Sequence, residues 1–179
     1  MNTTPRTVLI PLLVASFAPL CAKAQDYAAE GAKLEVDGRL GDGENKLVGA
    51  EVVLFVGNEQ VSSVRTDKAG RFHEDLELGK VYGLEFRSDG FIPKRIAIDT
   101  HMPKARPDQE IQLVPIDMNV SLLERGRYDG ANTDDLDFPF ALIKFNKKDM
   151  AFEQDLEYTM GMQRVNGALL LMAARADKH

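Results

Sequence analysis

Cysteine and tryptophan are the residues that this chain of 179 amino acids most clearly lacks: Cys21 is the only cysteine, and tryptophan is absent. Cys21 precedes Ala24, after which we expect a signal peptidase to cut, so the mature chain should contain no cysteine. A disulfide framework and thiol catalysis are then both excluded, and a packed apolar core must stabilise the fold. The absence of tryptophan also weakens the case for a sugar site, which usually needs flat, exposed aromatic rings.

Positive charge is scarce as well. The chain carries 22 lysine and arginine residues against 28 aspartate and glutamate residues, a net charge of −6. Removal of Arg6 and Lys23 with the N-terminal segment leaves 20 basic residues, so the mature chain has a net charge of −8. Non-specific nucleic-acid binding needs basic patches, so we expect no nucleic-acid partner. After residue 24 no apolar run approaches the roughly 20 residues of a membrane-spanning helix, so no transmembrane segment is expected in the mature chain.

The first 24 residues have the order of features that export requires. Arg6 gives the N-terminal end a positive charge, and an apolar run of 13 residues follows at 8–20. The segment 22–24 then places small alanines at the two positions that a signal peptidase recognises. We predict that residues 1–24 are a signal peptide, that the mature protein begins at Gln25, and that it is periplasmic or extracellular.

Cys21 leaves one alternative open, a lipid anchor attached to this cysteine. Lipoprotein signals favour a small residue immediately before the lipidated cysteine, and Leu20 occupies that position here. Cleavage after Ala24 is therefore the favoured interpretation, and a lipid-anchored protein that starts at Cys21 is the alternative.

Short runs of alternating apolar and polar residues extend from 33 to 115, and turn-forming residues separate them. A period of two is typical of half-buried strands, and no helical pattern lies between the runs. We therefore predict an all-β, seven-stranded antiparallel β-sandwich at 33–115, preceded by a linker at 25–32. The expected strands are 33–40, 50–56, 61–66, 72–78, 82–86, 91–99 and 110–113.

The sharpest local signal is the turn between the third and fourth of these strands. Asp67 can accept hydrogen bonds from the backbone that follows it, and Gly70 can adopt a positive φ. We therefore predict that the segment 66–72 closes a hairpin, with Asp67 and Gly70 as its structural turn residues.

After residue 115 the period of two weakens. Residues 118–122 alternate once more, 125–137 is rich in turn formers, and 138–145 is apolar on both faces. We predict an extension at 116–153 that contains a loop and a strand packed back onto the sandwich. From 154 to 177 the period becomes that of a helix.

The predicted C-terminal helix carries an apolar stripe at alternating spacings of four and three residues, as in a coiled-coil seam. The stripe consists of Tyr158, Met162, Val165, Leu169, Met172 and Ala176. Two interpretations stay open. The stripe packs on the chain's own sandwich, or it binds a protein partner.

Four short motifs occur in an order typical of one family. They are Gly49-Ala50 before the second strand, Thr66-Asp67-Lys68-Ala69-Gly70-Arg71-Phe72 in the turn, Gly79 with Tyr82 at a strand entry, and Gly90-Phe91. Together, over about 33–114, they resemble the carboxypeptidase regulatory-like domain. That resemblance implies a transthyretin-like or Ig-like sandwich that serves as a structural or binding accessory module, with no catalytic motif to transfer. The later segment 139–159 looks like the tail of many exported proteins of Bacteroidota-type bacteria.

The sequence offers few groups for catalysis. The three histidines, His73, His101 and His179, match no metal-ligand spacing. Hydrolases of transthyretin-like architecture need several catalytic histidines, so we assign no catalytic, cofactor-binding or metal-binding residue. The acidic loop at 129–137 has oxygens that could bind Ca²⁺, but it departs from the residue order of a calcium loop, and a solvated loop is the favoured interpretation.

We expect a non-enzymatic accessory or structural module that contacts another envelope protein or a second copy of itself. The alternative is a carbohydrate- or peptidoglycan-binding module of starch-binding-like fold. Aromatic residues near turns are few, namely Tyr82, Tyr128 and Phe91. A glycan partner is therefore not favoured.

Overall fold

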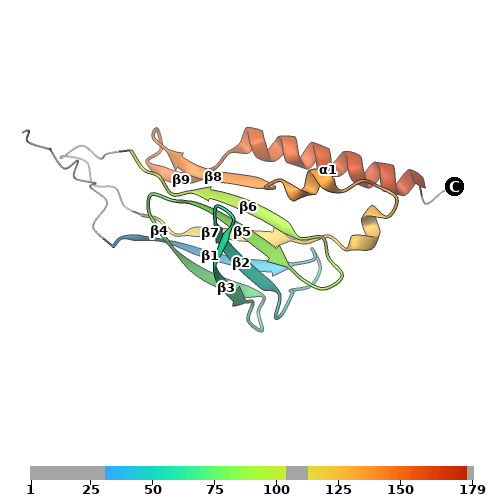
Figure 1. Ribbon diagram of the computed structural model, residues 1–179, viewed down its shortest axis with the longest axis horizontal. Helices are drawn as coiled ribbons and strands as arrows, with labels where there is room; N and C mark the ends of the chain where they lie inside the picture. The colour runs from blue at the N-terminus through green and yellow to red at the C-terminus, as the bar shows by residue number, and fades with distance from the viewer. Residues whose placement is uncertain (1–30, 104–112, 177–179) are drawn as a thin grey trace, which may run out of the picture.

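Two β-sheets and one long helix build the protein, which a computed structural model describes at residues 31–103 and 113–176 (Figure 1). Its strands are β1 (Lys33–Gly41), β2 (Glu51–Val56), β3 (Glu59–Arg65), β4 (Arg71–Glu77), β5 (Val81–Arg87), β6 (Lys94–Asp99), β7 (Ile116–Ser121), β8 (Ala141–Asn146) and β9 (Ala151–Gln154). Its helices are the 3-10 helices η1 (Arg125–Tyr128) and η2 (Asp134–Asp137) and the α-helix α1 (Leu156–Ala176). This is the β-sandwich with a C-terminal helix that the sequence predicts.

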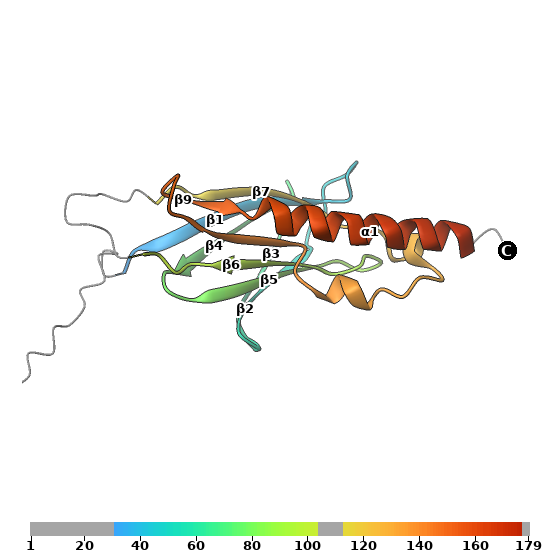
Figure 2. The same cartoon turned by 90° about the horizontal axis from the view of Figure 1, so that it is seen from above.

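The two sheets face each other, and α1 runs along the side where β8 and β9 lie (Figures 1 and 2). The smaller sheet has the strand order β4-β1-β7, and the larger has the order β3-β2-β5-β6-β8-β9. The strand number and directions differ from the prediction of seven antiparallel strands. β1 pairs with β7, and β6 pairs with β8, in parallel. Parallel neighbours need long connections, and a period of two gives no information on strand direction.

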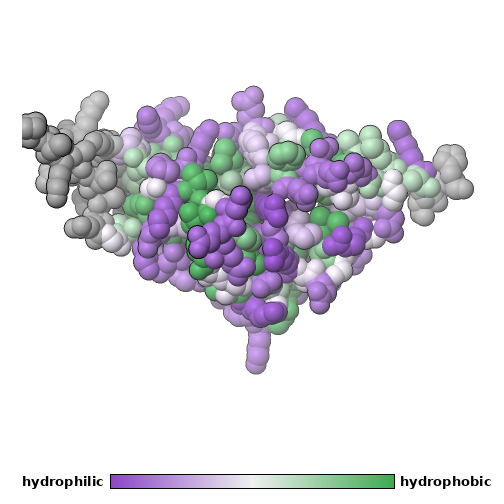
Figure 3. All heavy atoms as spheres, viewed as in Figure 1, coloured by the Kyte–Doolittle hydropathy of each residue, from purple (hydrophilic) through white to green (hydrophobic). Residues whose placement is uncertain are grey.

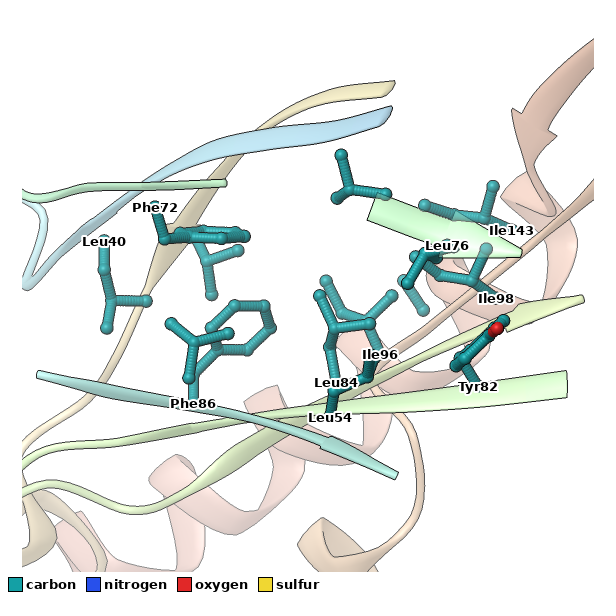
Figure 4. Packing of buried hydrophobic residues seen from close by; sticks show 14 of the residues in the cluster. Leu40, Leu54, Phe72, Leu76, Tyr82, Leu84, Phe86, Ile96, Ile98 and Ile143 are labelled. Carbon is teal, nitrogen blue, oxygen red and sulfur yellow. The ribbon is translucent and has the colours of Figure 1, made fainter. Parts of the chain in front are cut away.

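The core lies between the sheets and is filled from both (Figure 4). In β1 and β4 every second residue is buried, as the alternation predicts. Phe72 from β4 and Phe86 from β5 meet at the centre, with ring centroids 5.4 Å apart and planes tilted by 56°. Leu84 and Ile98 are also fully buried in this core. Burial of each such side chain contributes about 1.5–3 kcal/mol to stability.

The turn at 67–70 joins the two sheets instead of two strands of one sheet. β3 pairs with β2, and β4 pairs with β1, so the predicted hairpin between β3 and β4 is wrong. Within the turn, Asp67 Oδ1 accepts hydrogen bonds from the N–H groups of Ala69 (2.7 Å) and Arg71 (2.8 Å), and Gly70 has a φ of 73°. The residues thus specify the local turn geometry, but not the sheet that the following strand joins.

The last strand of the smaller sheet lies later in the chain than expected. The predicted strand 110–113 falls mostly on 104–112, outside the described residues, and 113–115 is not in a strand. β7 instead begins directly after Pro115 and contains most of the alternating residues 118–122. Proline lacks a backbone N–H group, so it is tolerated at the start of a strand.

The C-terminal extension packs onto the larger sheet. β8 covers most of the apolar segment 138–145 and joins the edge of β6, and β9 continues from it with Phe152 against Phe145 at 5.4 Å between centroids. α1 begins after Asp155, whose Oδ1 accepts a hydrogen bond of 3.1 Å from the N–H of Tyr158. This is the arrangement of an N-cap, which satisfies one of the unpaired donors at the start of a helix.

The predicted signal peptide at 1–24, its cleavage site and Cys21 all lie outside the described residues. Among the helices in the described ranges, none has the length and hydropathy needed to cross a bilayer.

Candidate functional site

The sandwich is closed along one long side and open along the other. On the closed side, Ser62 of β3 donates a hydrogen bond of 3.0 Å to the buried carboxylate of Glu74 in β4. On the open side, β7 of the smaller sheet faces β8 and β9 of the larger sheet across a groove of about 570 Å³. Its apolar walls are formed by Ile116, Met118, Val120, Phe140, Ile143 and Phe152. The volume lies within the roughly 300–1,000 Å³ of ligand clefts.

β7 presents to this groove a backbone edge with which no strand in the described residues pairs. It is the last strand of its sheet, and β1 is its only partner among the described strands. The N–H of Leu122 donates to the carbonyl of Gly41, and peptide groups alternate in direction along a strand. The N–H and C=O groups of Asp117, Asn119 and Ser121 therefore point away from β1, and all three residues line the groove. Such an edge is a template for a further strand.

Lys94 places a positive charge at one end of the groove. Its Nζ donates a hydrogen bond to the backbone oxygen of Ser121 and lies 4.3 Å from the centroid of the Phe140 ring. Burial lowers the pKa of Lys94 below its ordinary value. No carboxylate in the described part of the chain forms an ion pair with it, whereas Lys80 and Lys144 both pair with carboxylates. The ammonium group is thus partly desolvated without a neutralising partner, an arrangement that a carboxylate ligand would improve.

The motifs in the sequence do not single out Lys94, although a signal for its position exists. Lys94 precedes Ile96 and Ile98 at intervals of two residues, and both isoleucines are buried in the core. Because side chains alternate across a strand, all three point to the same face. An inward-facing lysine at the start of a strand is therefore readable from the alternation.

The predicted stripe on α1 is divided between the chain's own core and solvent. Tyr158, Met162 and Val165 are half-buried, and Leu169 is only 7% exposed, whereas Met172 is 58% exposed. Tyr158 also donates a hydrogen bond of 2.7 Å to the carbonyl oxygen of Pro139. Most of the stripe therefore packs on the protein itself, which is the first of the two interpretations left open by the sequence.

The buried face of α1 also contains polar and small residues, which a search for apolar residues in the sequence does not identify. The buried or half-buried positions include Thr159, Asn166 and Ala173. Thr159 accepts a hydrogen bond from Gln154, and Asn166 accepts one from the hydroxyl of Tyr128. Because these polar groups have partners, they are buried without the penalty of unpaired groups. The inward face is consequently rotated away from Met172.

Three large apolar residues on the opposite face of α1, Leu156, Met160 and Leu171, are exposed, and we call them the outer ridge. Their exposed fractions are 68%, 51% and 63%. At 3.6 residues per turn they lie within about 60° of one another around the helix axis. The space-filling view shows apolar surface along this upper edge of the molecule, interspersed with hydrophilic residues (Figure 3). Apolar residues exposed along one face of a helix are a common feature of contact sites.

His73 and the acidic loop, which the sequence analysis considered as candidate groups, lie apart from the groove and from the outer ridge. His73 is exposed on the outer face of the smaller sheet, with Asp37 at 3.0 Å and Asp75 at 3.2 Å from its ring nitrogens. In the acidic loop, Asn132 Oδ1 accepts a hydrogen bond from the N–H of Asp134, a local turn contact. Within residues 31–103 and 113–176, no group of three or more His, Cys, Asp or Glu side chains is placed to hold a metal ion.

The aromatic residues considered for sugar binding do not form an exposed platform. Tyr82 is 4% exposed in the core, and Tyr128 is 5% exposed under α1. Phe91 is half-buried. Stacking on a sugar needs an accessible ring face, so these three residues offer no platform for a glycan.

No protein-family model and no curated protein sequence matches the chain. Several solved structures match part of the chain. The Bacillus anthracis TIE protein matches with 20% identity and a TM-score of 0.39, over 52% of this chain and 17% of that one. Catechol 1,2-dioxygenase from Acinetobacter sp. ADP1 matches with 12% identity and a TM-score of 0.38, over 55% and 54% of the two chains. The group B streptococcus pilus 2b backbone protein matches with 16% identity and a TM-score of 0.35, over 50% and 40%.

Each match thus spans less than two thirds of the other protein, and the matches include both an enzyme and a pilus protein. At these TM-scores the likeness assigns no function. Kinship to the carboxypeptidase regulatory-like domain stays a prediction from the sequence motifs.

Proposed function

We propose that this protein is an exported, non-enzymatic module of the cell envelope that acts through protein–protein contacts and is related to carboxypeptidase regulatory-like domains. The N-terminal segment 1–24 supports export, and the motifs at 49–91 support the kinship. The observation that carries the contact function is the outer ridge of α1, because a folded domain gains stability when a partner covers such a surface. The partner is a second copy of the chain or another envelope protein.

Site-specific photo-crosslinking tests this proposal in the exporting cell. A photoreactive amino acid at Leu171, the C-terminal residue of the outer ridge, should give a discrete protein adduct, and the same group at the exposed turn residue Lys68 should not. The double variant Met160→Glu, Leu171→Glu should abolish self-association in sedimentation experiments or the adduct formed by a photoreactive group at Leu156. Exposed substitutions usually change stability by less than about 0.5 kcal/mol, so the melting temperature should be nearly unchanged.

Two results would count against the proposal. One is a monomer in sedimentation experiments that gives no protein adduct from any outer-ridge position. The other is saturable and specific binding on a glycan array without a protein partner, which would favour the carbohydrate-binding alternative. Mass spectrometry of the exported protein checks the compartment separately: we expect a mature chain that starts at Gln25, and a diacylglyceryl mass on Cys21 would make it a lipoprotein.

A further inference from the structure

We infer that the groove between β7 and β9 binds an extended polypeptide segment of a partner protein, which adds as a strand to β7 and places an acidic side chain against Lys94. This inference deepens the proposed function and rests on it, but it concerns a surface whose lining contains no residue of α1.

The backbone edge of β7 supplies the main recognition. β7 has six residues, and three of them, Asp117, Asn119 and Ser121, direct their N–H and C=O groups away from β1. A strand of about six residues is about 20 Å long, enough to run the length of β7. It would pair with the edge groups of Asp117 and Asn119 and with the N–H of Ser121, whose carbonyl oxygen accepts a hydrogen bond from Lys94. In strand addition the backbone hydrogen bonds supply affinity, and pockets for alternate side chains supply specificity. A polypeptide is favoured over a glycan because its backbone repeats matching donors and acceptors at the spacing of the strand.

The walls of the groove define the side chains of the docked strand. Met118 of β7 and Phe152 of β9 are only partly buried, although both pack against the core. A strand beside β7 would direct every second side chain between these two walls. Those side chains should be apolar, and the alternate ones should face solvent. Docking would then cover the apolar surface that the open side of the sandwich leaves accessible.

Lys94 adds a requirement for charge at one end of the docked strand. Its Nζ contacts the carbonyl oxygen of Ser121, so it lies beside the last residue of β7. A carboxylate at this point would form a charge-assisted hydrogen bond with the ammonium group, in a partly desolvated place where such bonds are strong. The occupant is therefore an alternating apolar strand with an acidic residue where it passes Lys94.

An unbiased peptide selection tests this inference. Displayed random peptides of about 12 residues, long enough for one added strand, are selected on the intact mature protein. We expect enriched peptides that alternate apolar and polar residues and contain an acidic residue. Hydrogen exchange should show that a bound peptide protects the backbone amides of Asp117, Asn119 and Ser121. Replacing the acidic residue of the peptide by its amide should weaken binding about tenfold or more, since the charge-assisted bond is lost.

Matched variants of the protein separate recognition from folding. Lys94→Met keeps the apolar stem of the side chain over Phe140 and should weaken peptide binding by the same factor, whereas Lys94→Arg should largely retain it. Lys68→Met, at an exposed turn, should leave binding unchanged. Asn119→Pro removes an edge N–H group that β1 does not use, and it should weaken binding while the unfolding midpoint in urea stays close to that of the wild type.

Three outcomes would overturn the inference. They are a selection without enrichment, enriched peptides that bind the Lys94→Met variant equally well, and protection confined to α1. In each case a crosslink from Leu171 would leave the proposed contact function standing. If the crosslink from Leu171 were also absent, both the inference about the groove and the proposed contact function would be wrong.

Discussion

The two long sides of the sandwich lie between the same two sheets, but they differ in whether the chain itself supplies a partner to the inward-facing polar side chain. On the closed side, Glu74 is 8% exposed and receives a hydrogen bond from Ser62, so its partner belongs to the chain itself. On the open side, Lys94 faces a groove and has no carboxylate partner within the described residues. A buried polar group with an internal partner stabilises the fold, whereas one without a charged partner is more stable when a ligand supplies it.

The turn at 67–70 and the residues beside it explain why the closed side needs no partner. Thr66 is buried, and its hydroxyl accepts a hydrogen bond from the N–H of Ala50 (3.0 Å) and donates one to the carbonyl of Leu47 (2.6 Å). The carbonyl oxygen of Gly70 accepts a hydrogen bond of 2.8 Å from the N–H of Leu40, which lies in the other sheet. The connection between β3 and β4 is thus tied to both sheets by hydrogen bonds, whereas β7 ends beside an open groove.

The largest expected effect comes from breaking the closed side at Gly70. A Cβ atom at this position would lie 2.8 Å from the carbonyl oxygen of Leu40, and the φ of 73° disfavours a β-branched residue. Gly70→Val should therefore lower the free energy of unfolding by about 2–6 kcal/mol, the sum of backbone strain and steric overlap. The measurement is equilibrium unfolding in urea.

Gly57→Val is the matched control for this prediction. Gly57 has a similar φ of 60°, but no atom lies within 4 Å of its added Cβ, so the variant carries backbone strain without overlap. It should cost about 1–3 kcal/mol. If the two variants were equally stable, the close approach of Gly70 to Leu40 would not contribute to the closure of this side.

A smaller effect is expected on the open side, where α1 packs on the larger sheet. Leu169 is 7% exposed and Leu171 is 63% exposed on the same helix. Leu169→Ala should destabilise the protein by about 2 kcal/mol, the lower end of the range for buried leucines, because it packs at the surface of the sandwich. Leu171→Ala should cost less than about 0.5 kcal/mol. Thermal unfolding of both variants is the measurement, and equal losses would mean that the inward face of α1 has been misassigned.

Sequence patterns predicted the parts of the fold that depend on local periodicity. The alternation in β1 and β4 gave the buried faces, and the apolar segment at 138–145 gave the strand that packs back. Information on which sheet a strand joins is not local, so the turn at 67–70 was assigned to a hairpin and the parallel direction of β7 was not foreseen. The buried face of α1 differs from the predicted stripe because it includes the polar residues Thr159 and Asn166. Their hydrogen-bond partners are supplied only by the tertiary structure.

The groove was beyond prediction for a related reason. It arises because β7 and β9 end up at neighbouring edges of different sheets, and no motif records that arrangement. The inward direction of Lys94 was readable from its spacing to Ile96. The lack of a carboxylate beside it was not, since that depends on every element that surrounds the groove.

The smallest expected effect concerns His73, on the outer surface of β4, the strand of the smaller sheet that borders the closed side. The hydrogen bond to Asp37 raises the pKa of His73 above its ordinary value of 6.5; burial opposes this rise, and the charges of Asp37 and Asp75 add to it. A raised pKa in the folded state means that the folded protein binds the proton more tightly than the unfolded chain. The resulting stabilisation is fully present below about pH 6.5 and is lost as the pH rises through the folded-state pKa.

The variant His73→Gln isolates this contribution, because the other titrating groups are common to both proteins. We expect the wild type to exceed the variant in free energy of unfolding by less than about 1 kcal/mol near pH 5.5, since the ion pairs are exposed and screened by solvent. Near pH 8.5 the difference should shrink towards zero, because the imidazole is then neutral in both the folded and the unfolded chain. Urea unfolding of both proteins at the two pH values measures it, and added salt should reduce the difference at the lower pH. A difference that grew with pH would mean that the neutral imidazole, acting as a hydrogen-bond donor to Asp37, is the form that joins β4 to β1.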